Sequence, residues 1–268
     1  MPTVTESAEF QKFLDTVQYS NAGILKYEMI FGDGFISTGG PTTTLHLCEK
    51  YLDGKIAENP KILDVGCGIG GGCAYLADRY NAHVVGVDLS SNVINIAKER
   101  YAEHSNLEFK IEDALLGDYK EGEFDMIYSR DALLHVAEKA KLFKLFYKWL
   151  KPGGIVLITD YCCGEPQYLH EEFKAYVAQR GYHLLTVPNY EKILTDAGLT
   201  AKGENITEWF RKILKMEKER LLEPKMAARF LEKYNKEEMD KLVAGWDDKL
   251  KTTAENCHVW GVFFATKD

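Results

Sequence analysis

Short apolar runs alternate with helical patterns along the middle of the chain. Apolar or alternating clusters predict strands at 61–65, 83–88, 107–111, 124–129, 155–160, 200–205 and 260–266. Apolar residues repeated every three or four positions predict helices between them, at about 73–79, 92–103, 139–150 and 190–197. Strands that alternate with helices in this way predict a doubly wound α/β fold, whose sheet is covered on both faces.

About sixty residues precede the first strand. Helical patterns at about 10–17 and 41–52 flank a polar and aromatic mixture that includes Gln18, Tyr19 and Tyr27. Such a segment covers a sheet edge or closes over a ligand, and the mixture favours a lid.

A second long helical block, at 208–251, precedes the last strand and is predicted to break near Pro224 and Gly245. We interpret it as an insertion between the last two strands. We expect one domain over 1–268, with a helical lid at 1–54, core sheet at 55–205 and 256–268, and the insertion at 206–255.

The first predicted strand leads into five glycines within seven residues, 66–72. Residues without Cβ let a backbone bend sharply and let a ligand touch the main chain. A helix follows, so its free N–H groups face the loop. Asp64 interrupts the apolar strand, where a buried carboxylate needs a partner. Strand, glycine loop and helix together predict the nucleotide-binding start of a doubly wound domain.

Two more acids follow predicted strands. Asp88 lies 22 residues after Gly66, the distance at which a carboxylate binds both ribose hydroxyls of a nucleoside. Alternatively Asp88 caps the helix that begins after Leu89, although Ser90 could do so instead. Asp113, followed by Ala114, ends the third strand and suits an adenine amino group. Ligands of open α/β sheets gather at these carboxyl ends.

The composition and charge of the chain limit the classes of molecule that it is expected to bind. The 268 residues are 46% hydrophobic and carry a net charge of −8, which argues against broad binding of nucleic acid or membrane surfaces. No secretory signal and no apolar run of membrane-spanning length is visible. The six cysteines show neither disulfide nor zinc spacing, so we expect reduced thiols, a cytoplasmic protein and no metal. We also expect a monomer.

The glycines at 66, 68 and 71 also fit G-x-G-x-x-G, so a nicotinamide dinucleotide must be weighed. Three features argue against it: Asp64 within the strand, the acid after the third strand, and the turn at 150–154 before a strong fifth strand. With the phenylalanine-rich last strand, these features resemble Class I S-adenosylmethionine-dependent methyltransferases. The resemblance implies a seven-stranded Rossmann-like sheet with an antiparallel last strand, and S-adenosyl-L-methionine as cofactor.

A sharper resemblance covers essentially the whole chain. The chain is similar to the compact phosphoethanolamine N-methyltransferases at 18–19, 27–28, 31–32, 35–37, 39–40, 128–132, 135, 159–162, 173–176, 179–182 and 260–261. The family implies a small-molecule substrate, phosphoethanolamine, methylated three times to phosphocholine, a precursor of phosphatidylcholine. Cys67 stands where some members have Ser, and the region 224–238 matches least.

The resemblance implies that Tyr19 and His135 form a catalytic pair. The acceptor must be a free amine, but a primary amine with a pKa of about 10 is mostly ammonium at neutral pH. A histidine, with a reference pKa of about 6.5, can accept its proton. The plainer alternatives are a buried structural histidine at a helix start and a tyrosine that only packs.

The resemblance assigns further residues to the substrate and the donor. The phosphate dianion calls for cations and hydroxyl donors, and the matching residues are Tyr27, Tyr161, Tyr176, Arg180, Tyr182 and Lys249. Arg180 and Lys249 could instead lie on solvated helix faces. Gln18 and Asp131 would face the amine. The donor would contact Ile36, Ser37, Asp64, Gly66, Asp88, Leu89, Asp113, Ala114 and Arg130.

Two other functions stay open. A methyltransferase for a sterol, an acyl chain or a glycine-type amine would need an apolar or carboxylate-binding pocket, whereas Arg180 and Lys249 favour phosphate. A non-catalytic module that only binds the nucleoside would not need Tyr19 and His135.

Overall fold

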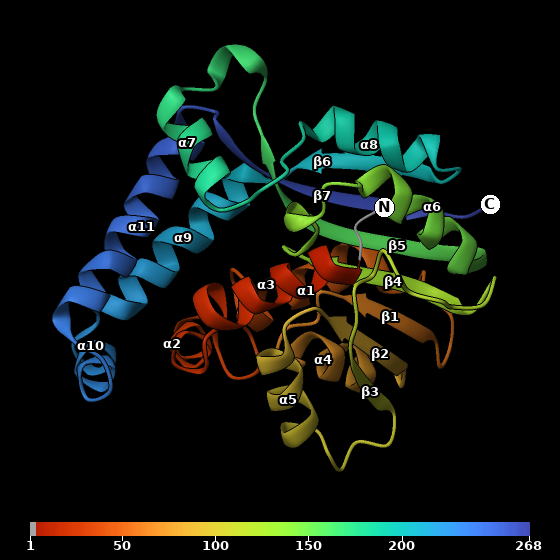
Figure 1. Cartoon of the computed structure of the whole chain (residues 1–268), viewed down its shortest axis with the longest axis horizontal. Coiled ribbons are helices and arrows are strands. Elements are labelled where there is room, and N and C mark those ends of the chain that lie inside the picture. Colours follow the sequence, from red (N-terminus) through yellow and green to blue (C-terminus); the bar gives the residue numbers. More distant parts are fainter. Residues whose placement is uncertain (1–3) are drawn as a thin grey trace.

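A seven-stranded mixed sheet forms the centre of the computed structural model, which describes residues 4–268 and their side chains except at 4–7, 17–18 and 21. Its order is β3-β2-β1-β4-β5-β7-β6 (Figure 1). The strands are β1 (Lys61–Val65), β2 (His83–Asp88), β3 (Leu107–Ile111), β4 (Phe124–Arg130), β5 (Leu150–Cys163), β6 (Thr200–Asn205) and β7 (His258–Thr266). β7 runs antiparallel to β5 and β6, while β1 to β5 pair in parallel. The predicted fold class is therefore confirmed.

Helices cover both faces of this sheet. They are α1 (Val4–Phe13), α2 (Asn21–Phe31), α3 (Gly40–Leu47), α4 (Gly71–Tyr80), α5 (Ser91–Arg100), α6 (Lys139–Trp149), α7 (Glu171–Gln179), α8 (Val187–Asp196), α9 (Thr207–Leu222), α10 (Pro224–Leu231) and α11 (Lys236–Ala254). Short π-helical segments follow α1 and α3, at Leu14–Gln18 and Cys48–Leu52. No helix in residues 4–268 is both long enough and apolar enough to span a bilayer.

Successive residues of a strand pack into two separate hydrophobic cores, one on each face of the sheet. Ile62 packs with α4 and α5 residues such as Leu76 and Val93, whereas its neighbour Leu63 packs with the α6 and α8 side. This period of two is the pleat of a strand buried on both faces. It explains why the strands read as nearly continuous apolar runs.

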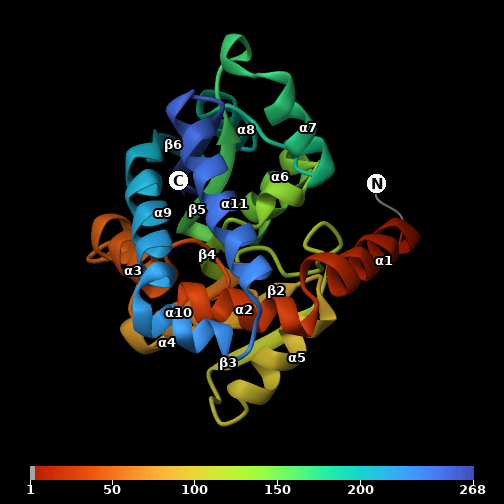
Figure 2. The ribbon, with the colours of Figure 1, turned by 90° about the vertical axis from the view of Figure 1, so that its left-hand side faces the viewer.

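The insertion α9–α11 lies beside one end of the sheet, next to α2 and α3 (Figures 1 and 2). The predicted break at Pro224 is present, because Pro224 begins α10. The predicted break at Gly245 is wrong: Gly245 lies within α11. A capping box between Asn235 and Glu238 stabilises the start of α11, and buried Trp246 anchors it. These outweigh the roughly 1 kcal/mol that a helical glycine costs relative to alanine.

Candidate functional site

A cavity of about 1190 Å³ opens at the carboxyl ends of the parallel strands. All the predicted site residues except Gln18 line it, and the side chain of Gln18 lies outside the described ones. We call the part formed by the loop at 66–72 with Asp64, Asp88 and Asp113 the glycine-loop end. We call the part formed by Tyr161, Tyr176, Arg180, Tyr182 and Lys249 the aromatic end.

The loop at 66–72 has the backbone of a ligand cradle. Gly66, Gly68 and Gly70 have φ of 79°, 55° and 89°, a conformation that side chains rarely allow. A Cβ on Gly68 would lie 3.1 Å from Ile36 Cδ1, so the predicted donor residue Ile36 lies directly against the loop. Neighbouring side chains fill the space beside these glycines, so the loop can keep this conformation only without a Cβ at these positions.

Asp88 is held by main-chain amides on both oxygens. Gly68 N donates to Oδ2 at 3.0 Å and Ser90 N donates to Oδ1 at 2.9 Å. Burial raises the pKa of Asp88 to about 6 despite these bonds. Asp88 therefore fixes the glycine loop and the start of α5 together, with Leu89 between them on the cavity wall.

The other two acids also have local partners. Cys73 Sγ donates to Asp64 Oδ2 at 3.2 Å, and burial raises the pKa of Asp64 to about 7. Leu115 N donates to Asp113 Oδ1 at 2.9 Å, which sets the turn that carries Ala114. The buried carboxylate of β1 thus has a thiol as its partner.

Arg130 fixes the segment that carries Ile36 and Ser37. Its guanidinium donates to Thr38 O at 2.6 Å, Gly40 O at 3.0 Å and Thr44 Oγ1 at 2.7 Å. Arg130 also lines the cavity, so its contact with the donor stays a prediction.

Asp15 ties the N-terminal segment to the glycine-loop end. Its carboxylate accepts from Ser90 Oγ and Ser91 Oγ, each at 2.6 Å, at the N-terminus of α5. Asn92 Nδ2 donates to Asp15 O at 3.0 Å and to Tyr19 O at 2.9 Å, which fixes the backbone of Tyr19. The sequence reasoning missed Asp15, because nothing local distinguishes it from other polar helix residues.

His135 ends a short 3₁₀ turn, Leu133–His135, that buried Asp160 holds in place. Leu134 N donates to Asp160 Oδ1 at 3.0 Å. The imidazole packs edge-on against Tyr182, with ring centroids 5.1 Å apart. Burial, with nearby Lys139 and Arg180, lowers the pKa of His135 to about 4, so the ring is neutral at pH 7. The predicted pairing of His135 with Tyr19 stays a prediction, although both line the same cavity.

Asp131 lies in strained backbone, with φ of 52°. Its Oδ1 accepts from Trp260 Nε1 at 2.7 Å and from Thr159 Oγ1 at 3.1 Å. Its Oδ2 is buried and has no hydrogen-bond partner among the described residues. One carboxylate oxygen is therefore oriented by the protein, and the other is able to accept a hydrogen bond from a ligand.

Aromatic rings from separate elements converge at the aromatic end. Tyr182 packs edge-on against Tyr176 and Tyr161, at centroid distances of 6.0 and 6.4 Å. Lys249 Nζ lies 5.3 Å from the Tyr161 ring centroid, and the Arg180 guanidinium lies 5.9 Å from that of Tyr176. The structure thus brings two cations to one wall of phenolic side chains.

Glu217 of α9 connects Trp246 of α11, the helix that carries Lys249, to Gly39 of the N-terminal segment, a contact that the sequence did not indicate. The side chain is 1% exposed. It accepts from Gly39 N at 2.6 Å and from Trp246 Nε1 at 3.2 Å. Burial raises the pKa of Glu217 to about 7.

The fold and cavity define a methyltransferase domain, and the Methyltransferase domain family matches residues 56–213. Phosphoethanolamine N-methyltransferase 1 of Arabidopsis thaliana is 46% identical over 97% of this chain and 52% of its own length. The Plasmodium falciparum phosphoethanolamine N-methyltransferase is 40% identical over 99% of this chain and 100% of its own. The chain belongs to the phosphoethanolamine N-methyltransferase family. It spans about half the length of the plant relatives it matches.

A solved structure agrees with this family. Haemonchus contortus phosphoethanolamine N-methyltransferase 2, in complex with phosphomonomethylethanolamine and S-adenosylhomocysteine, superimposes with a TM-score of 0.91 at 39% identity. The match covers 96% of this chain and 60% of that one. A putative sarcosine dimethylglycine methyltransferase from Galdieria sulphuraria, at 20% identity and a TM-score of 0.74, shares the fold.

Proposed function

We propose that this chain transfers methyl groups from S-adenosyl-L-methionine to the nitrogen of phosphoethanolamine, in three steps that end at phosphocholine. One observation carries the proposal: a single cavity joins the glycine-loop end to an aromatic end that contains two cations, with Asp131 in the same wall. The names of the relatives support the same reaction.

The glycine-loop end fits the donor. The glycine backbone at 66–70 suits the close approach of a nucleoside and its amino-acid tail, and Asp88, at the end of β2, would accept hydrogen bonds from the ribose hydroxyls. S-adenosyl-L-methionine, when bound, supplies a methyl group on a positively charged sulfur, which leaves as a neutral thioether. The chain's own task is to align the acceptor nitrogen with that methyl group and to exclude water.

Asp131 and His135 would prepare the substrate nitrogen for methyl transfer. The unpaired Oδ2 of Asp131 would bind the incoming ammonium, and neutral His135 would accept a proton from it, which leaves a lone pair for the transfer. A phosphate dianion that pairs with Arg180 also cancels a charge that lowers the pKa of His135, so substrate binding makes the histidine a better base. The trimethylated product has no proton left to give, which ends the sequence.

A product panel tests the proposal. Purified protein with S-adenosyl-L-methionine and phosphoethanolamine should give mono-, di- and trimethylated products by mass spectrometry. Ethanolamine without phosphate should react poorly, because it leaves Arg180 and Lys249 without an anion. Glycine and a sterol serve as acceptors of the rival classes. Methylation of either in preference to the phosphobase, or no product above blank, would overturn the proposal.

We further propose that residues 1–54 act as a lid within a single domain, and that the protein works as a monomer in the cytoplasm. The docking of Asp15 on α5 supports the lid, because breaking those bonds would free Tyr19. All six cysteines are free thiols, which supports the cytoplasmic location. Light scattering with and without ligands would measure the oligomeric state.

A further inference from the structure

His258, the first residue of β7, is an imidazole buried inside the aromatic end. It lines the cavity yet is only 1% exposed. Its ring centroid lies 4.8 Å from that of Tyr161, which stands perpendicular to it, and 6.4 Å from that of Tyr176. Phe173 and Phe210 close the other sides, each at 5.5 Å.

Neither ring nitrogen of His258 has a hydrogen-bond partner among the described residues. A neutral imidazole carries one donor and one acceptor, and burying both unpaired costs free energy. The hydroxyl of Tyr176 is also buried, and it lies beyond hydrogen-bond distance of any partner among the described residues. Unpaired polar atoms gathered on one cavity wall indicate that a polar ligand completes them.

We propose that His258 is a further contact for the phosphate group of the substrate, and that it takes up a proton from solvent when the dianion binds. This inference rests on the proposed function. A ring N–H donates to a phosphate oxygen, and the protonated ring adds a positive charge beside Lys249 and Arg180. The charged hydrogen bond is then formed only when phosphate is present.

The charges around His258 in the free protein determine whether its ring is protonated before the substrate binds. Lys249 of α11 is the charged side chain that acts on His258, while β5 and α7 present the rings of Tyr161 and Tyr176, and α9 presents the apolar ring of Phe210. Burial and the Lys249 charge lower the pKa of His258 to about 3, so the ring is neutral before substrate binds. A buried dianion reverses the sign of the local charge and raises that pKa.

Two variants separate the contribution of the hydrogen bond from that of the protonation of His258. His258→Phe keeps an aromatic ring but removes both functions, and His258→Gln keeps an N–H donor that cannot be protonated. His83→Gln is the matched control, because His83 also opens a strand but is exposed on β2. Calorimetry at pH 7 in two buffers of different ionisation enthalpy measures the affinity and the proton uptake together, with phosphoethanolamine, ethanolamine or inorganic phosphate as probes.

We expect the wild type and His83→Gln to take up protons with phosphoethanolamine, and both His258 variants to take up fewer. The Kd for phosphoethanolamine should rise about ten- to hundredfold in His258→Phe and less in His258→Gln, with affinity for S-adenosylhomocysteine unchanged. Equal Kd and proton uptake in all four proteins would overturn the role of His258 alone. A wild type that binds no phosphoethanolamine would overturn the proposed function as well.

A measurement on the wild type covers the case in which a variant fails to fold. In protein with ¹⁵N-labelled histidine, the ring nitrogens of His258 should shift from the neutral to the protonated range when phosphoethanolamine is added. Unchanged shifts at saturating phosphoethanolamine would overturn the proposal.

Discussion

The two ends of the cavity are built in different ways. At the glycine-loop end, both oxygens of Asp88 are already bonded to main-chain amides, and the residues come from one stretch of about fifty. At the aromatic end, β5, α7 and α11 each contribute a side chain, and the Lys249–Tyr161 contact joins residues 88 apart in the chain. There the Tyr176 hydroxyl and the His258 nitrogens have no hydrogen-bond partner in the described part of the chain. The hydrogen bonds of the first end are formed within the chain, whereas we propose that a ligand completes those of the second.

The largest effect is expected at His135, which packs against Tyr182 of the aromatic end and which we propose as the general base. His135→Ala should lower kcat about 10²- to 10⁴-fold, because a positioned general base contributes on that order. Affinity for S-adenosylhomocysteine, measured by calorimetry, should not change, and exposed His83→Ala should leave both quantities at their wild-type values. A loss of donor affinity would instead make His135 a structural part of the glycine-loop end.

A reciprocal pair of variants tests whether the two ends work separately. Arg180→Ala should raise the KM for phosphoethanolamine about ten- to hundredfold, because it removes a charged hydrogen bond, and should leave donor affinity unchanged. Asp88→Asn should weaken donor binding by a similar factor with little change in the acceptor KM. Arg229→Ala, on exposed α10 residue Arg229, is the control. Variants that change both affinities equally would contradict the division.

The smallest catalytic effect is expected at Glu217, which lies outside both ends and joins Gly39 to Trp246 of α11. Its folded pKa is raised above the unfolded value, so its contribution to stability is present below about pH 4.5 and is lost as pH rises through about 7. Glu217→Gln mimics the protonated form and removes this dependence. Between pH 5 and 8, the free energy of unfolding of the Glu217→Gln variant should rise relative to that of the wild type, by about 3 kcal/mol at most. Denaturant melts at several pH values measure this, and parallel curves would contradict it.

The sequence predicted the glycine-loop end better than the aromatic end, for a physical reason. Strands and a glycine loop are local patterns, so β1, β2 and the loop between β1 and α4 were found at nearly their observed bounds. The partners of Glu217 and the unpaired nitrogens of His258 exist only after distant segments pack together. No spacing along the chain encodes them. Trp260 was noted through family resemblance, but its bond to Asp131 required the fold.

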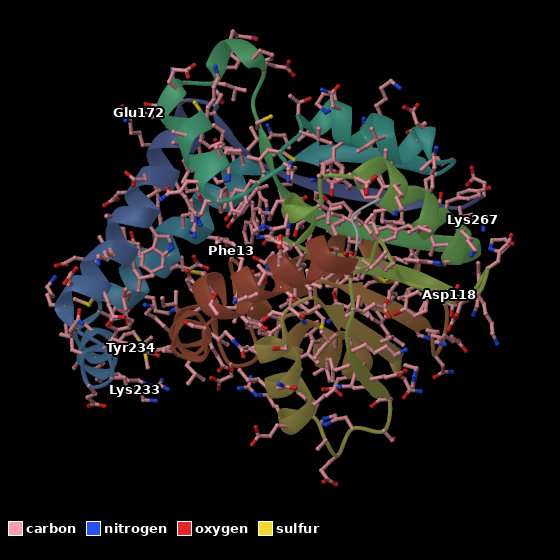
Figure 3. The ribbon with its side chains drawn as sticks, viewed as in Figure 1. Phe13, Asp118, Glu172, Lys233, Tyr234 and Lys267 are labelled. Atoms are coloured by element: carbon pink, nitrogen blue, oxygen red, sulfur yellow. The ribbon has the colours of Figure 1, made fainter. Side chains whose placement is uncertain are left out.

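The reversed direction of β7 has a consequence for the order in which the molecule is made. The strand begins at the cavity with His258 and leads to Lys267, whose ammonium donates to Tyr147 O and Leu150 O at 2.8 and 2.9 Å. Figure 3 shows Lys267 at the opposite edge of the molecule from Glu172 of α7. A ribosome releases the β1–β4 region long before β7, but a single domain folds as one unit. A nascent chain therefore completes its sheet only after β7 has emerged and has taken its place between β5 and β6.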